Sequence, residues 1–310
     1  MTAEDISSAG SERPQSALGA YPIDHRSVRR AFARAAATYA KAAVLTREVA
    51  TRMLERLQYI KIEPRRILDA GSGEGHGAKQ LAGRYPGAQV LALDFAHPML
   101  RAARGQDTWV GRVFNRARVD YLCADFAAIP LPAASVELAW SNLALHCAGD
   151  PLPALKELHR VLKPGGLLMF SCYGPDTLKE LKSAFAAHDR ALHVHGFIDM
   201  HDLGDTLVAC GFAAPVMDME VITLTYADAD MLLADLRATG QKNALAERRR
   251  GLTGKGIFSA MRTAYENLRR DGRLPASFEI LYGHAWKPQP RLSADGRAII
   301  RLHPAPAKGT

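Results

Sequence analysis

The chain has 310 residues, 48% of them hydrophobic and 23% charged, and this composition is typical of a globular protein with one large domain. No run approaches the roughly 20 apolar residues that span a bilayer. The first residues also lack the basic and apolar regions of a secretory signal, so we expect a cytoplasmic protein without a membrane partner. The four cysteines form no CxxC pair, so neither a metal site nor a disulfide framework is predicted.

The net charge of +8 is unevenly distributed along the chain. Residues 23–57 carry eight Lys and Arg against three acidic residues, and residues 227–277 carry ten against six, whereas residues 58–226 are nearly neutral. Basic segments of this kind could attract an acidic macromolecule. The alternative is a set of solvated basic helices that only keep the protein in solution.

The ends of the chain differ in composition from its centre. Residues 1–22 are rich in Ser, Ala, Gly and Pro without periodicity, which predicts a disordered arm. Residues 24–57 are rich in Ala, Arg and Leu and contain no Pro or Gly, which predicts a helix. The helix opens a predicted domain at 23–288, and residues 289–310 are expected to form a disordered tail.

Short apolar runs then alternate with amphipathic segments. The runs are RRILDA, QVLALD, VDYLCAD, VELAWSN and GLLMFSCY, and two further strands are predicted at 215–226 and 277–288. Continuous apolar strands separated by helices predict an α/β fold with a doubly wound, seven-stranded, mostly parallel sheet. Residues 227–277 form a helical insertion between the last two strands, and we expect it to cover the carboxyl edge of the sheet.

The stretch ILDAGSGEG at residues 67–75 places Gly71, Gly73 and Gly75 directly after Asp69. A phosphate-binding P-loop would need Lys and Ser or Thr after its last glycine, and a dinucleotide fingerprint would space the glycines differently. The pattern D-x-G-x-G-x-G resembles that of class I methyltransferases that use S-adenosylmethionine (SAM). A carboxylate beside glycines suits the ammonium group of SAM, because glycines without Cβ let the backbone approach a ligand closely.

Acidic residues also end the next two predicted strands. Asp94 stands where a carboxylate can accept hydrogen bonds from the ribose hydroxyls, and Phe95 and Met99 could pack on adenine or belong to the core. Asp125 resembles the acid that binds the adenine amino group in this family, with the Phe126 N–H alongside. The predicted cofactor set is Asp69, Ala70, Gly71, Gly73, Gly75, Asp94, Phe95, Met99, Asp125, Phe126 and Asn142.

A closer resemblance concerns the acceptor. VRRAFARAAATY, WSNLALH, LKELHRVLKPGG, YGPDTLKEL and FEILYGHAWKP together resemble the malonyl-acyl-carrier-protein O-methyltransferases of biotin synthesis, over about residues 24–288. The resemblance implies transfer of the methyl group of SAM to the free carboxylate of a malonyl thioester on an acidic acyl carrier protein, with S-adenosylhomocysteine as the second product. Since that carboxylate is ionised at neutral pH, no general base is required.

Three residues are candidates for positioning the substrates. Tyr39 resembles the tyrosine that closes over the methyl group and the acceptor in this family, with a core aromatic as the alternative. His146 follows the fourth strand and could be a hydrogen-bond donor, a structural histidine or, less expected, a base. Tyr173 ends the fifth strand, and its hydroxyl could reach the site or meet solvent.

The basic run Arg248, Arg249 and Arg250 has two interpretations. One of these arginines could meet the malonyl carboxylate, or the run could face outward and help the carrier protein dock. We expect a monomer or weak dimer.

Two other functions stay open. One is a methyltransferase for a quinone or another small molecule, and the other is a SAM-fold assembly protein or arginine hydroxylase of respiratory complex I. Methylation of nucleic acid is disfavoured, because SNLALH replaces the Asp/Asn-Pro-Pro-Tyr/Phe pattern expected after the fourth strand, and few aromatic residues accompany the basic segments.

Overall fold

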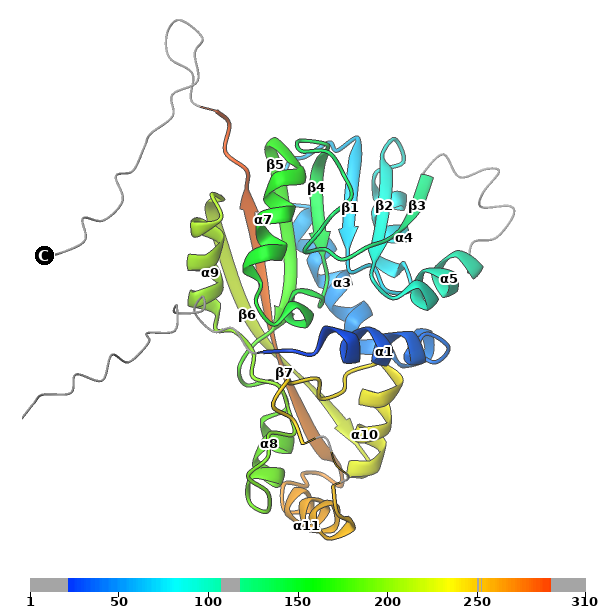
Figure 1. Ribbon diagram of the computed structural model, residues 1–310, viewed down its shortest axis with the longest axis vertical. Coiled ribbons are helices and arrows are strands. Elements are labelled where there is room, and N and C mark those ends of the chain that lie inside the picture. Colours follow the sequence, from blue (N-terminus) through cyan, green and yellow to red (C-terminus); the bar gives the residue numbers. More distant parts are fainter. Residues whose placement is uncertain (1–21, 107–117, 250, 252, 291–310) are drawn as a thin grey trace, which may run out of the picture.

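Seven strands form one sheet in the order β3-β2-β1-β4-β5-β7-β6 (Figure 1). β7 runs antiparallel to β5 and to β6, and the other neighbouring pairs are parallel, which confirms the predicted fold class. The strands are β1 (Arg66–Ala70), β2 (Gln89–Asp94), β3 (Arg118–Cys123), β4 (Val136–Ser141), β5 (Leu162–Tyr173), β6 (Ala213–Tyr226) and β7 (Leu274–Trp286).

This computed structural model describes residues 22–106, 118–249, 251 and 253–290. The predicted arm and tail therefore lie almost wholly outside the described residues. Within these ranges, no helix is both long enough and apolar enough to cross a membrane.

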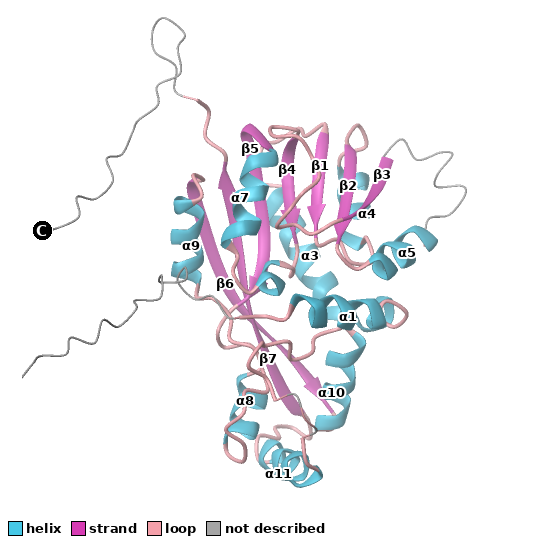
Figure 2. Ribbon diagram, in the orientation of Figure 1, coloured by secondary structure: helices cyan, strands magenta, loops and turns pink. Residues whose placement is uncertain are grey.

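Helices cover both faces of the sheet (Figure 2). α3 (Val44–Leu57) and α4 (His76–Arg84) bury Leu and Val side chains in the core on one face, and α7 (Leu152–Val161) and α9 (Met200–Ala209) do so on the other. The central strands β1, β2 and β4 are mostly apolar, as expected for strands that are buried on both faces. Other helices are α5 (His97–Gly105), the 3₁₀ helix η1 (Leu145–Ala148) and α8 (Lys179–Ala186).

The span 24–57, predicted as one helix, is three helices in the structure: α1 (His25–Ala35), α2 (Tyr39–Ala42) and α3. The first break needs no Pro or Gly, because it is made by tertiary contacts. The Thr38 hydroxyl lies 3.0 Å from the carbonyl oxygens of both Ala35 and Ala238. The resulting turn places Tyr39 over the carboxyl edge of the sheet.

The segment between β6 and β7 contains α10 (Ala229–Ala238) and α11 (Lys255–Glu266). We expected this insertion to cover the carboxyl edge of the sheet, but α1 takes that place and α10 packs against α1 from the other side (Figure 1). The residues after α10 are also joined to the start of α1, since the Asp24 N–H donates to the Ala244 carbonyl at 2.8 Å. The insertion thus supports the N-terminal helices.

Candidate active site

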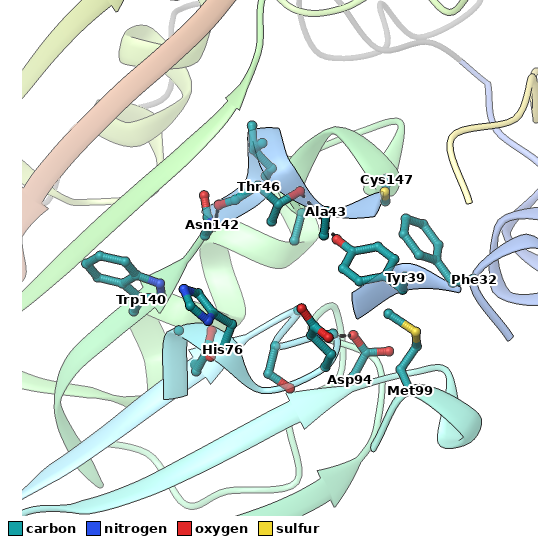
Figure 3. Close-up of a pocket in the computed structure, with 18 of the residues that line it drawn as sticks. Phe32, Tyr39, Ala43, Thr46, His76, Asp94, Met99, Trp140, Asn142 and Cys147 are labelled. Atoms are coloured by element: carbon teal, nitrogen blue, oxygen red, sulfur yellow. Dashed lines mark hydrogen bonds between the residues drawn. The ribbon is translucent and has the colours of Figure 1, made fainter. Parts of the chain in front are cut away.

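A cavity opens at the carboxyl ends of β1, β2 and β4, beneath the N-terminal helices (Figure 3). It brings together side chains and backbone from the glycine loop, the ends of three strands and the segment 32–47. The predicted cofactor residues that line it are Asp69, Gly71, Gly73, Asp94, Phe95, Met99, Phe126 and Asn142.

The glycine loop makes a tight turn from β1 into α4. Gly71, Gly73 and Gly75 all have positive φ angles, of +81°, +54° and +77°. Gly71 is the most constrained, because a Cβ there would lie 2.3 Å from the Cβ of Ala144. Gly75 caps α4 and faces away from the cavity lining, so its role is in the turn.

Three buried polar atoms in the cavity wall have no hydrogen-bond partner among the described residues, and one of them is Oγ of Ser72. The other two are Oδ2 of Asp69, a residue that is only 2% exposed, and Nε1 of Trp140. A Cβ on Gly77 would lie 3.2 Å from both atoms, so they face the same small space. Buried polar groups are almost always paired, and a carboxylate beside an indole N–H fits an amino-acid group with its ammonium and carboxylate.

Asp94 holds the glycine loop from the end of β2. Its Oδ2 accepts the Gly73 N–H at 2.9 Å and its Oδ1 accepts the Ala96 N–H at 2.7 Å. Burial raises the pKa of Asp94 to about 6, against the effect of these two hydrogen bonds. Burial, followed by the charge of Asp94, raises the pKa of Asp69 to about 7. The cavity thus contains two carboxylates that would gain from a bound cation.

The N-terminal segment closes the cavity. Tyr39 is buried, its hydroxyl lies 3.5 Å from Oγ1 of Thr46, and burial raises its pKa to about 12. The Asn142 amide donates to the Thr46 carbonyl at 2.9 Å and accepts from the Ser171 hydroxyl at 2.9 Å, which ties α3 to the ends of β4 and β5. Figure 3 shows the Tyr39 ring beside Phe32 and Met99.

Some residues that line the cavity were not predicted from the sequence. The missed residues are Phe32, Ala43, Thr46, Arg47, Ser72, Glu74, His76, Gly77, Trp140 and Cys147. Several lie in WSNLALHC or next to the glycines and could have been found from that position. Arg47, whose guanidinium pairs with the buried Glu74 at 3.4 Å, could not, because only the packing of α3 brings it to the cavity.

Three predicted cofactor residues lie outside the cavity lining. Ala70 is buried in β1, and its carbonyl accepts the Ser141 hydroxyl at 2.9 Å. Gly75 is the cap described above. Asp125 is exposed, and its carboxylate accepts the Ala127 N–H at 2.8 Å, so in this structure it acts as the strand-end cap.

His146 and Tyr173 lie together behind the cavity, in an aromatic cluster with Phe197. The ring centroids are 4.6 Å apart for His146 and Tyr173, 5.8 Å for His146 and Phe197, and 5.6 Å for Tyr173 and Phe197. Both ring nitrogens of His146 are buried without a hydrogen-bond partner among the described residues. Burial, and then the neighbouring His195, lowers the pKa of His146 to about 3, although the Gln241 side chain acts in the opposite direction.

The arginine run is occupied within the chain. Arg248 pairs with Asp24 at 3.0 Å, and Arg249 pairs with Asp189 at 3.0 Å. Arg250 lies outside the described residues. The expectation that this run faces outward is therefore wrong for Arg248, which is half-buried and fastens the insertion to the start of α1.

The chain is similar to known methyltransferases. A family model described as a methyltransferase domain matches residues 68–170. Malonyl-[acyl-carrier protein] O-methyltransferases from Gallionella capsiferriformans and Laribacter hongkongensis are each 52% identical to this chain; they align over 92% and 93% of it and over 98% and 99% of their own lengths. The chain belongs to this family. It is a SAM-dependent O-methyltransferase, and its cofactor is SAM.

Solved structures agree with the methyltransferase fold. A protein of Bacillus halodurans described as a methyltransferase superimposes with a TM-score of 0.55 at 17% identity, over 77% of this chain and 99% of its own. The YcgJ protein of Bacillus subtilis superimposes with a TM-score of 0.52 at 16% identity, over 76% of this chain and 98% of its own.

Proposed function

We propose that this methyltransferase transfers the methyl group of SAM to the free carboxylate of malonyl-acyl carrier protein, and that the methyl ester formed enters biotin synthesis. The support is the identity of about half of all positions to malonyl-[acyl-carrier protein] O-methyltransferases across nearly the whole chain. A quinone methyltransferase or a hydroxylase of complex I is not favoured by these relatives.

In the proposed cofactor arrangement, Asp69 and Trp140 bind the amino-acid end of SAM. Asp69 would accept from its ammonium and Trp140 Nε1 would donate to its carboxylate. Asp94 would accept from the ribose hydroxyls through its free lone pairs, and Phe95 and Met99 would pack on adenine. When bound, SAM supplies an electrophilic methyl group on a positively charged sulfur.

The acceptor chemistry requires orientation more than proton transfer. A C–O bond to the malonyl carboxylate forms as the C–S bond breaks, its electron pair leaves with sulfur, and the two opposite charges cancel. No proton moves in this reaction, so no general base is needed. The low pKa of His146, about 3, agrees with this, because such a group is a poor general base near neutral pH. Tyr39 would exclude water from the reacting groups and hold them in line, and Asn142 would fix the wall beside them.

Binding of SAM is expected to depend on pH through the buried carboxylates. With a pKa of about 7 for Asp69 and about 6 for Asp94, the ligand-free folded protein keeps protons that the unfolded chain loses near the ordinary value of 3.8. The contribution of these two carboxyl groups to the free energy of unfolding of the unliganded protein is therefore highest below about pH 4 and falls as the pH rises to 7. The ammonium of SAM favours the ionised carboxylates, so affinity rises over the same window.

Calorimetry at pH 5.5 and 7.5 in two buffers with different ionisation enthalpies measures this linkage. We expect about tenfold tighter SAM binding at the higher pH, with proton release on binding at the lower one. An affinity that is flat across this window would show that Asp69 does not meet the ammonium.

We further propose that the carrier protein docks on α1. This helix contains no acidic residue, and four of its arginines are exposed and form no ion pair in the described structure: Arg26, Arg29, Arg30 and Arg34. α1 lies across the carboxyl ends of the strands, next to the cavity (Figure 1). An acidic carrier would therefore be attracted to the entrance of the site.

Charge reversal tests the docking proposal. The double variant Arg29→Glu/Arg30→Glu should raise the KM for malonyl-acyl carrier protein about tenfold at low salt, with the Kd for SAM unchanged, and added salt should reduce the difference. Lys156→Glu, on the exposed face of α7, is the matched control and should leave KM unchanged. Equal KM values for wild type and the α1 variant would place docking elsewhere.

The activity itself is tested by mass spectrometry of the carrier. Malonyl-acyl carrier protein should gain the mass of one methyl-for-hydrogen exchange in the presence of enzyme and SAM, while acetyl-acyl carrier protein, which has no free carboxylate, should not change. Formation of S-adenosylhomocysteine without this mass change would point to another acceptor.

A further inference from the structure

A second cavity lies behind the aromatic cluster of His146, Tyr173 and Phe197. It is formed by α8, α10, α11 and the segments 193–197 and 241–243. Its apolar side chains include Leu181, Phe185, Leu236 and Phe258, and its polar ones include Arg237, Gln241 and Lys242.

The aromatic cluster links the second cavity to the wall of the cofactor cavity. Phe197 lines the second cavity, and its ring contacts the rings of His146 and Tyr173. On the other side, Cys147, the residue after His146, lines the cofactor cavity. The inner end of the second cavity, at Phe197, is thus joined through His146 to Cys147 in the wall of the cofactor cavity.

The cavity has charge at its rim and apolar surface inside. Arg237 and Lys242 are exposed and form no ion pair among the described residues, so their charges are available to an anion. Gln241 can both donate to and accept from an amide. At the inner end, the Phe197 ring packs against His146, which lies beside the Gln241 side chain.

This order of groups matches a phosphopantetheine arm, which has a phosphate at one end, two amides separated by short apolar links, and a thioester at the other end. We infer that the second cavity binds this arm of the acyl carrier protein, with its phosphate at Arg237 and Lys242 and its thioester at the aromatic cluster. The inference rests on the proposed function. It gives the phosphopantetheine arm a binding site of its own, separate from the surface of α1 where the carrier protein docks.

Binding of two forms of the carrier protein isolates the contribution of the arm. Apo-carrier protein lacks phosphopantetheine, whereas malonyl-carrier protein has it, and S-adenosylhomocysteine in place of SAM prevents turnover. Wild-type enzyme should bind the malonyl form at least tenfold more tightly. The variant Arg237→Ala/Lys242→Ala should reduce this difference at least fivefold, and Leu236→Trp, which fills the apolar part, should do the same.

Two controls separate the possible outcomes. Arg29→Glu/Arg30→Glu should weaken both forms of the carrier equally and keep the difference between them, and Lys156→Ala should change neither. The Kd for S-adenosylhomocysteine shows whether each variant is folded. A difference that persists in both cavity variants, or is absent in wild type, overturns the inference, whereas a failure of the proposed function shows separately as no methyl transfer to malonyl-carrier protein.

Discussion

Replacing Asp94 with asparagine is expected to weaken SAM binding by about 100-fold, because both oxygens of this buried carboxylate already accept backbone N–H groups. The amide NH₂ of asparagine would face one of those N–H groups and leave a buried donor unpaired, at a cost of about 1–3 kcal/mol. The variant would also lose the charge proposed to bind the ribose hydroxyls. Titration calorimetry with SAM measures the loss.

Asp125→Asn is the matched control for this experiment. Asp125 also follows a strand, β3, but it is exposed and lies outside the cavity lining, and an asparagine there could still accept the Ala127 N–H. We expect less than about a threefold change in the Kd for SAM. Similar losses in the two variants would restore the adenine-binding role that the family resemblance implies for Asp125.

Replacing Gly71 with alanine is expected to have the largest effect on stability. The residue has φ of +81°, where a side chain costs about 1–3 kcal/mol, and the added Cβ would lie 2.3 Å from that of Ala144. Relieving such an overlap typically costs a further amount of about 1–3 kcal/mol. Chemical denaturation should therefore show a loss of several kcal/mol, and SAM binding should be lost because the loop moves.

Gly83→Ala controls for the loss of a glycine as such. Gly83 lies in α4, and no atom is within 4 Å of a Cβ built there. Alanine in a helix is favoured over glycine by about 0.5–1 kcal/mol, so this variant should be slightly more stable than wild type. If Gly71→Ala were as stable as Gly83→Ala, the tight packing of the glycine loop against Ala144 could not be a constraint on the fold.

The sequence determined the sheet and the core of the cofactor site, because both depend on local patterns. Apolar runs with a turn after each one define parallel strands, and the carboxyl ends of such strands meet at one edge. Asp69 and Asp94, which stand at two of those ends, could therefore be assigned to one site before any contact was known. The closer resemblance then indicated the family, which the comparisons confirmed.

Only the tertiary structure decided which of the remaining groups reach the cavity. A helix of small and basic residues gives no sign that it will turn at Thr38, because the turn depends on Ala238, which is 200 residues away. That turn carries Tyr39 and Thr46 over the strand ends, while Arg248 is paired with Asp24 and Asp125 remains exposed. Contacts between distant segments reflect the shape and packing of the whole domain, which no local pattern encodes.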